Sequence, residues 1–158
     1  MFNALSLFGT LAVAQALFAE QPCEKLIDLK LPDAEITSAV SIPAGAVSIG
    51  TGNARPIDMP ARCIVKAIAR PTSDSQIKMD IWLPAANWNG RYMQTCNGGW
   101  AGTIPIASLA NAIQRGYAAA GTNGGHDAGG TDGPAGWAIG HPEKLIDFGH
   151  RALHETGE

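Results

Sequence analysis

The chain has 158 residues, of which 46% are hydrophobic and 16% charged, and its net charge at pH 7 is −3. This length is enough for one domain with one core. Because basic residues do not cluster, neither nucleic acid nor an anionic membrane is an expected partner.

The first segment, residues 1–19, is mostly Leu, Ala, Phe and Val and carries no charged side chain. It is too short for a comfortable transmembrane helix, and Leu17-Phe18-Ala19 before Glu20 is a plausible signal-peptidase site. It lacks the usual Lys or Arg near its start, so a buried N-terminal helix is the alternative. We predict a signal peptide over residues 1–19, a domain over residues 20–158, and a secreted, extracellular protein.

The next part of the chain, up to residue 60, predicts little regular structure. A short helix or an anchoring segment is expected over residues 23–31, because Pro32 interrupts this apolar run. Residues 37–49 are rich in Val, Ile and Ala but contain a proline and a glycine, which suits one edge strand or two short strands. Several Gly, Asn and Pro residues over 51–60 predict a loop.

Two β-type runs follow. Residues 63–69 are rich in Ile and Val, and residues 76–83 alternate between apolar and polar side chains. Alternation with period two predicts a strand with one packed face. With a turn over residues 71–75, the two runs predict an antiparallel hairpin at the start of a sheet, which Pro84 ends.

A turn, a short strand and a glycine-rich loop come next. Asn89 and Gly90 accept positive φ at low steric cost and predict the turn, and residues 92–95 predict the strand. Gly98 and Gly99 then leave backbone N–H groups uncovered by side chains. At the end of a strand, such groups can point at an oxygen that becomes negative during a reaction. A glycine-rich surface turn without chemistry is the alternative, because short glycine motifs are common.

A helix over residues 106–115 is indicated by apolar residues at helical spacing, and Gly116 is placed to end it. Residues 117–121 form a short apolar run typical of a buried strand. Strand, helix and strand over residues 92–121 predict one βαβ unit, which is typical of a parallel sheet.

The last part of the sequence holds a second glycine-rich loop, residues 122–140, and then a helix that begins at Pro142. Asp127 could orient His126 as a base. Adjacent residues in a loop rarely have their side chains in that geometry, so we predict that His126 is structural and links two loops. If the sheet is incomplete, its last parallel strand exposes an unpaired edge, and we expect poor solubility or a molten state.

Three cysteines, Cys23, Cys63 and Cys96, remain after residue 19. In an oxidising compartment an odd number means that one is free or has a partner elsewhere. The sequence has no CxxC and no close Cys/His spacing, so no metal site is expected. No serine lies in a Gly-x-Ser-x-Gly motif.

Five short motifs occur in one order between residues 81 and 155. They are Trp82-Leu83-Pro84, Trp88-Asn89-Gly90-Arg91, Asn97-Gly98-Gly99-Trp100-Ala101-Gly102, Gly116-Tyr117-Ala118 and Ile146-Asp147-Phe148-Gly149-His150-Arg151-Ala152-Leu153-His154. In this order and spacing they resemble the tannase and feruloyl esterase family of secreted serine esterases. The match covers most of the chain after residue 19.

The resemblance implies an α/β-hydrolase core with an inserted lid, and a Ser-His-Asp triad that cleaves esters of aromatic, phenolic acids such as gallate or ferulate. Gly98 and Gly99 match the loop that holds the oxyanion. Trp88 and Trp100 could shape a pocket for the aromatic acid, or they could be packing residues. Family members often carry calcium in the lid.

The resemblance also implies a disulfide between Cys23 and Cys63, positions that are bridged in family members. Cys96 would then be the odd thiol, where the family usually has glycine. A buried free thiol is more plausible there than a nucleophile, because no partner base is evident.

The chain departs from the family in length. The family's nucleophile, acid, base and lid all lie beyond residue 158, so we expect the N-terminal part of an α/β-hydrolase sheet with no triad residue, no cofactor and no esterase activity of its own. A non-catalytic secreted binding protein for aromatic ligands is one alternative, and a truncated gene product without function is another.

Overall fold

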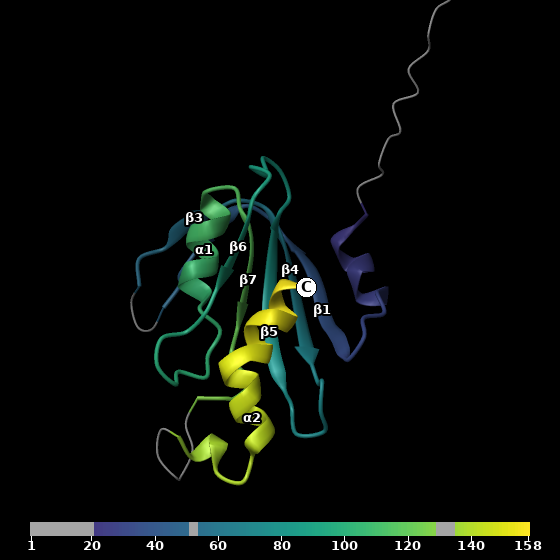
Figure 1. The fold of residues 1–158 in the computed structure, drawn as a ribbon. Helices are drawn as coiled ribbons and strands as arrows, with labels where there is room; N and C mark the ends of the chain where they lie inside the picture. Colours follow the sequence, from purple (N-terminus) through teal and green to yellow (C-terminus); the bar gives the residue numbers. More distant parts are fainter. Residues whose placement is uncertain (1–20, 51–53, 129–134) are drawn as a thin grey trace, which may run out of the picture.

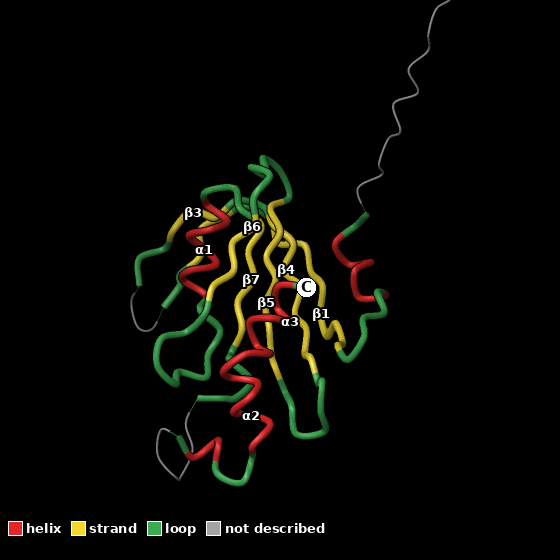
Figure 2. Tube along the Cα trace, in the orientation of Figure 1, coloured by secondary structure: helices red, strands yellow, loops and turns green. Residues whose placement is uncertain are grey.

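The computed structural model describes residues 21–50, 54–128 and 135–158, so the predicted signal peptide lies outside the described residues. A five-stranded sheet has the order β1-β4-β5-β7-β6, and β2 and β3 form a separate ribbon (Figures 1 and 2). The strands are β1 (Ala34–Ile42), β2 (Gly45–Val47), β3 (Ile57–Met59), β4 (Arg62–Ala69), β5 (Ile77–Pro84), β6 (Tyr92–Thr95) and β7 (Ala118–Thr122). The helical segments are η1 (Cys23–Asp28), α1 (Ile106–Gln114), η2 (Gly136–Ala138), α2 (Pro142–Ile146), η3 (Asp147–Arg151) and α3 (Ala152–Gly157).

The predicted hairpin is confirmed as β4 and β5, which pair antiparallel with Val65 opposite Ile81. Strand β1 pairs antiparallel with β4 at the edge of the sheet, and a bulge lies between Ile36 and Ser38. The region that suited one edge strand or two short strands therefore holds both an edge strand, β1, and the first strand of the ribbon, β2.

The predicted βαβ unit is confirmed as β6, α1 and β7, because β6 and β7 pair parallel with Thr95 opposite Gly121. Strand β7 also pairs antiparallel with β5, so it lies inside the sheet. The expectation that the last strand forms the exposed edge is therefore wrong, and the edge on this side is β6. The sequence of β7, AAAGT, suits the interior position because small side chains allow close packing on both faces.

The two faces of the sheet carry different helices, as the alternation of β5 requires. On one face, Leu109 and Ile113 of α1 are fully buried against Trp82. On the other face, Ala152 of α3 packs with Ile77 and Met79. No helix in the described ranges is long and apolar enough to cross a membrane.

The C-terminal helix begins at Pro142, as predicted, but it contains a π-helical turn, η3, which the sequence pattern did not predict. Asp147 in this turn is completely buried, and its Oδ1 accepts hydrogen bonds of 3.0 Å from Ser75 Oγ and from Arg151 Nη1. Arg151 Nη2 also donates to Glu143 at 2.7 Å. The hydrogen bonds that Arg151 donates to Glu143 and Asp147 raise the pKa of its guanidinium. The π-helical turn η3 thus contains both the buried carboxylate, Asp147, and its cationic partner, Arg151.

Candidate functional site

The glycine-rich loop after β6 presents two backbone amides outside the sheet ladder. The parallel pairing of β6 ends at Thr95, and Gly98 and Gly99 are both exposed. Gly99 has a φ of +58°, and a Cβ built at either glycine meets no atom within 4 Å. In the described part of the chain, neither amide donates a hydrogen bond to another residue. As far as the described residues show, both donors are therefore available beside open space at the carboxyl end of a parallel strand.

Contacts at both ends of this loop fix its position. At its start, Asn97 Nδ2 donates to the carbonyl of Thr122 at 3.1 Å. At its far end, the carbonyl of Gly102 accepts a hydrogen bond from Ala128 N at 3.0 Å. Gly102 has a φ of +59°, and a Cβ there would lie 2.5 Å from Ala128 N, so only glycine fits this close approach. The loop after β7 thus holds the loop after β6.

His126, in the loop after β7, contacts the loop after β6. It is 4% exposed, its ring stacks on Trp137 at 4.0 Å, and Phe148 meets it edge-on at 5.5 Å. One ring nitrogen lies 3.4 Å from the carbonyl oxygen of Trp100, and the other lies 3.4 Å from that of Gly124. This position agrees with the predicted structural role of His126.

Asp127 does not orient His126. Both of its carboxylate oxygens instead accept hydrogen bonds from Lys78 Nζ, at 2.8 and 2.7 Å. These hydrogen bonds lower the pKa of the Asp127 carboxyl. The pair joins β5 to the loop after β7. Sequence reasoning singled out neither Lys78 nor Trp137. For Lys78, the only signal in the sequence was its polar position in an alternating strand. No signal in the sequence pointed to Trp137.

The structure separates the two tryptophans that were predicted to line a pocket. Trp100 is 55% exposed and follows Gly99 directly. Trp88 is 61% exposed and precedes β6, where its Nε1 donates to the carbonyl of Arg91 at 3.0 Å. A four-residue strand spans roughly 13 Å, so the two side chains lie at opposite ends of β6. Only Trp100 lies beside the two glycines.

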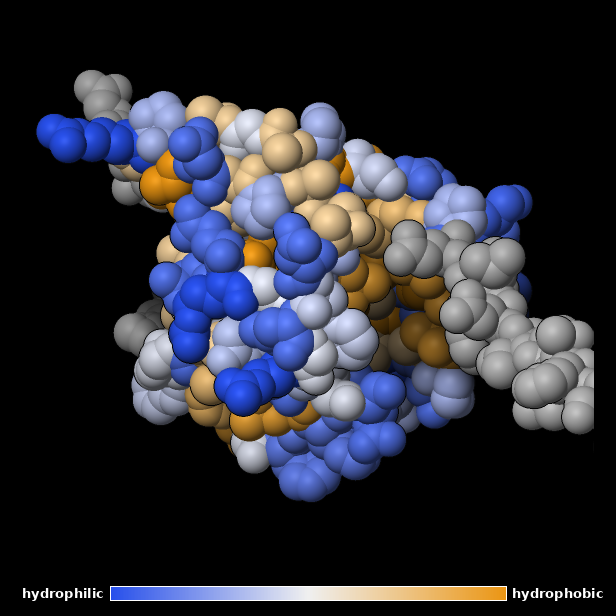
Figure 3. All heavy atoms as spheres, turned by 90° about the horizontal axis from the view of Figure 1, so that it is seen from above, coloured by the Kyte–Doolittle hydropathy of each residue, from blue (hydrophilic) through white to orange (hydrophobic). Residues whose placement is uncertain are grey.

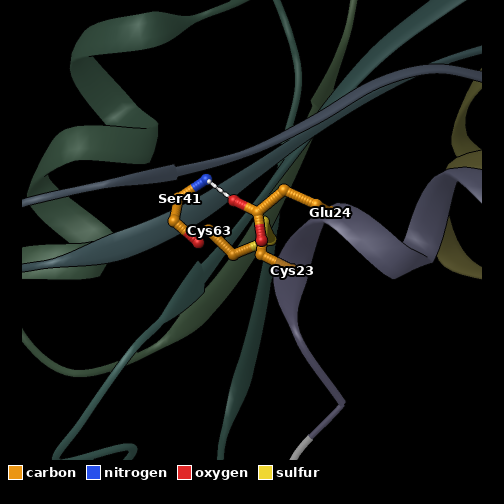
Figure 4. Close-up of a disulfide and its surroundings, with 4 residues drawn as sticks. All are labelled: Cys23, Glu24, Ser41 and Cys63. Carbon is orange, nitrogen blue, oxygen red and sulfur yellow. Dashed lines mark hydrogen bonds between the residues drawn. A yellow bond between two sulfur atoms is a disulfide. The ribbon is translucent and has the colours of Figure 1, made fainter.

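The disulfide between Cys23 and Cys63 is present and joins η1 to β4, with a Cα–Cα distance of 5.6 Å (Figure 4). Beside it, a carboxylate oxygen of Glu24 accepts a hydrogen bond from Ser41 N at 2.9 Å, which lowers the pKa of that carboxyl. Cys96 is a free, exposed cysteine, so the expectation that its thiol is buried is wrong. The reason is that it follows the last paired residue of β6 and has left the sheet.

A cavity lies beside this disulfide, and no residue of the glycine loop lines it. It measures about 670 Å³ and is lined by residues of η1, β1, β4 and β5, among them Leu26, Ile42 and Leu83. Figure 3 looks at the molecule from above and shows a hollow lined by hydrophobic side chains on this face. Residues 83–85 mark the end of the sheet where β6 begins, so this cavity is remote from Gly98 and Gly99.

Comparison with known proteins identifies the family. Residues 63–158 match the family model described as tannase and feruloyl esterase. The chain belongs to this family. Within the tannase and feruloyl esterase family, it is 42% identical over 154 residues to a protein of Xanthomonas campestris pv. campestris described as an uncharacterized esterase, covering 95% of this chain and 26% of that protein. It is 36% identical over 166 residues to a probable feruloyl esterase B of Aspergillus clavatus, covering 95% and 30% of the two chains.

The fold of this tannase and feruloyl esterase family chain is shared with a solved member. The crystal structure of feruloyl esterase B from Aspergillus oryzae superposes with a TM-score of 0.71 at 33% identity, covering 85% of this chain and 26% of that one. The expected α/β fold, with an antiparallel hairpin that leads into a parallel βαβ unit, is confirmed. The chain spans 26–30% of the length of these curated relatives.

Proposed function

We propose that this chain contributes the oxyanion-binding part of a secreted carboxylic ester hydrolase that acts on esters of phenolic acids through a serine acyl-enzyme. The single observation that carries the proposal is the pair of free amides, Gly98 and Gly99, beside open space at the carboxyl end of β6. The names of the relatives, feruloyl esterases among them, support the substrate class.

The chemistry follows from where charge develops. When a serine oxygen adds to the ester carbonyl, the carbonyl oxygen becomes an oxyanion, and N–H groups that point at it lower the barrier. Removal of one such donor typically costs about 3 kcal/mol of transition-state stabilisation. A nucleophile at the carboxyl end of a strand parallel to β6, on its free edge, would stand next to Gly98 and Gly99. Acyl transfer of this kind needs no metal or cofactor, and we propose none for it.

The same geometry assigns different roles to the two tryptophans. We propose that Trp100, which directly follows the oxyanion glycines and is 55% exposed, contacts the aromatic acid of the ester. Trp88 at the other end of β6 is then a surface residue whose indole caps the carbonyl of Arg91. The disulfide supports a secreted protein, because such bonds persist in oxidising compartments.

The 158 residues alone are proposed to have no esterase activity. Ser75 is buried and bonded to Asp147, and no serine has the glycine-flanked elbow that exposes a nucleophile. Hydrolysis of a ferulate or gallate ester by the purified chain tests this point, and turnover above a buffer blank would refute it.

A chimera tests the oxyanion role. Residues 63–158 would replace the matching segment of feruloyl esterase B from Aspergillus oryzae, and ferulate ester hydrolysis would be measured. Gly98→Pro removes one N–H, and we expect it to lower kcat by about 100- to 1000-fold. Gly98→Ala keeps the N–H and enters open space, so it serves as the matched control and should stay within a few-fold of the unmutated chimera. Equal activity of a folded Gly98→Pro chimera and its control would rule out the amide of Gly98 as a donor.

A further inference from the structure

Two histidines lie close together on the outer face of the C-terminal helix, away from the glycine loop. His150 in η3 and His154 in α3 are both exposed, and their ring centroids are 5.7 Å apart with the planes tilted by 35°. Residues spaced by four positions share one face of a helix. Glu158, four residues further on, places a carboxylate oxygen 4.0 Å from His154 Nδ1.

We propose that His150 and His154 bind one divalent late transition-metal ion of the zinc or copper class, with the Glu158 carboxylate as a third ligand and water in the remaining positions. Imidazole is a preferred ligand of these ions, and two histidines at positions i and i+4 of a helix are a known arrangement for zinc. The sequence did not predict this site, because the expected metal motifs all contained cysteine.

The ring separation fits the proposal. Two imidazoles that each bind a tetrahedral ion through a nitrogen at about 2.0 Å have centroids roughly 5 Å apart. The observed 5.7 Å therefore needs only a small rotation of each exposed ring. In the described ranges no three His, Cys, Asp or Glu side chains already form a metal-binding group. Glu158 closes the site by rotation, which its 74% side-chain exposure allows.

The charges around the two histidines favour a cation. Arg151, the only basic residue between them, has both ends of its guanidinium engaged by Glu143 and Asp147. The Arg151 side chain is therefore turned away from the helix face that carries His150 and His154, here called the histidine face. The ion would tie the π-helical turn to the last α-helical turn.

Calorimetric titration of the 158-residue chain with ZnCl₂ at pH 7.5 tests the site. We expect saturable binding of one ion per chain, and no comparable binding of CaCl₂ or MgCl₂, which prefer oxygen ligands. His150→Asn and His154→Asn are each expected to weaken zinc binding by at least about 10-fold, since even loss of a residue behind a metal ligand costs that much. Because only neutral imidazole binds the ion, binding should weaken at pH 5.

The matched control is His141→Asn. His141 is also exposed, but it is paired with Asp74 at 2.7 Å and lies outside the histidine face of α3. Its replacement should leave zinc affinity unchanged. Zinc should also raise the Tm of the wild-type chain and not that of the His150→Asn/His154→Asn variant. Absence of saturable zinc binding up to 1 mM (about the weakest Kd worth calling a site), or equal binding by the double variant, overturns the proposal. Neither result bears on the esterase proposal, which uses neither histidine.

Discussion

Asp80 is a buried carboxyl group on β5 that is 4% exposed. Burial raises the pKa of this carboxyl, and the charge of Lys66 acts in the opposite direction. The folded state therefore binds the proton more tightly than the unfolded state, and the free energy of unfolding falls as the pH rises through the raised pKa. We expect Asp80→Asn to raise the Tm at pH 7 and to lose this advantage below about pH 4, the usual range of the carboxyl.

Thermal unfolding of both proteins at pH 7 and pH 4 measures the effect. Asp28→Asn is the control, because Asp28 is exposed on η1 and its side chain is 70% accessible. Its Tm should match the wild-type value closely at both pH values. A lower Tm for Asp80→Asn at pH 7 would mean that contacts to the carboxylate outweigh its burial.

Gly102 and Gly98 offer a matched pair of substitutions in one loop. Alanine at Gly102 would combine a positive φ with a contact of 2.5 Å to Ala128 N. We expect Gly102→Ala to lower the free energy of unfolding by about 1–3 kcal/mol. Gly98→Ala enters open space and should change it by less than about 0.5 kcal/mol. Urea denaturation measures the free energy of unfolding of both variants. Equal values would show that the two loops move apart at Gly102 with little loss of stability.

At the scale of elements, the disulfide joins η1 to β4 across a sequence separation of 40. The disulfide lowers the conformational entropy of the unfolded chain, which adds about 4 kcal/mol to the free energy of unfolding for a loop of this size. The variant Cys23→Ser/Cys63→Ser is therefore expected to lower the Tm by roughly 10 °C. Cys96→Ser, at an exposed free cysteine, is the control and should leave the Tm nearly unchanged. Scanning calorimetry under non-reducing conditions gives the comparison, and a Tm loss of similar size in both variants would contradict it.

The π-helical turn depends on the buried pair of Asp147 and Arg151. Asp147→Ala removes the buried carboxylate that accepts hydrogen bonds from Arg151 Nη1 and Ser75 Oγ, so we expect a loss of about 3 kcal/mol in the free energy of unfolding. Glu143→Gln breaks only the half-exposed ion pair to Arg151 and should cost less than about 1 kcal/mol. Urea denaturation of the two variants tests the ranking. The reverse order would mean that the partly exposed pair, and not the buried one, holds the turn.

Some elements could be predicted from the sequence and others could not. Alternation over residues 76–83 predicted β5, and the helical spacing after Pro105 predicted α1, because both patterns reflect which face of an element is buried. The position of β7 between β5 and β6 depends on pairing between distant residues, which no local pattern records. Asp147 in the π-helical turn likewise accepts a hydrogen bond from Ser75, which is far from it in sequence.

In the candidate site too, some residues could be predicted from the sequence and others could not. Gly98 and Gly99 could be found because glycines after a strand are a local signal. The structural role of His126 could be predicted as well, but its stacking on Trp137 and the pairing of Lys78 with Asp127 could not, since these contacts join segments that are far apart in the sequence. Trp88 and Trp100 were both candidates for one aromatic pocket, but they lie at opposite ends of β6.

At the scale of the whole molecule, apolar side chains on the C-terminal helix remain exposed. Leu145, Ile146 and Leu153 are 53%, 46% and 46% exposed, and among the strands that the structure describes none pairs with the outer edge of β6. We expect the isolated chain to associate as its concentration rises. Light scattering between low and high micromolar concentration checks this, and Leu145→Lys should reduce the association. A monomer with one sharp unfolding transition at all concentrations would contradict the expectation.

Because β7 is inserted between β5 and β6, the edge strand of the sheet is synthesised before its inner neighbour. Strand β6 ends at Thr95, and β7, its partner within the described residues, ends at Thr122. At about 5–20 residues per second, the ribosome needs roughly one to five seconds to make this interval. During that time β6 has no strand to pair with, while the hairpin of β4 and β5 is already complete. A chaperone that recognises extended nascent chain has those seconds in which to bind it.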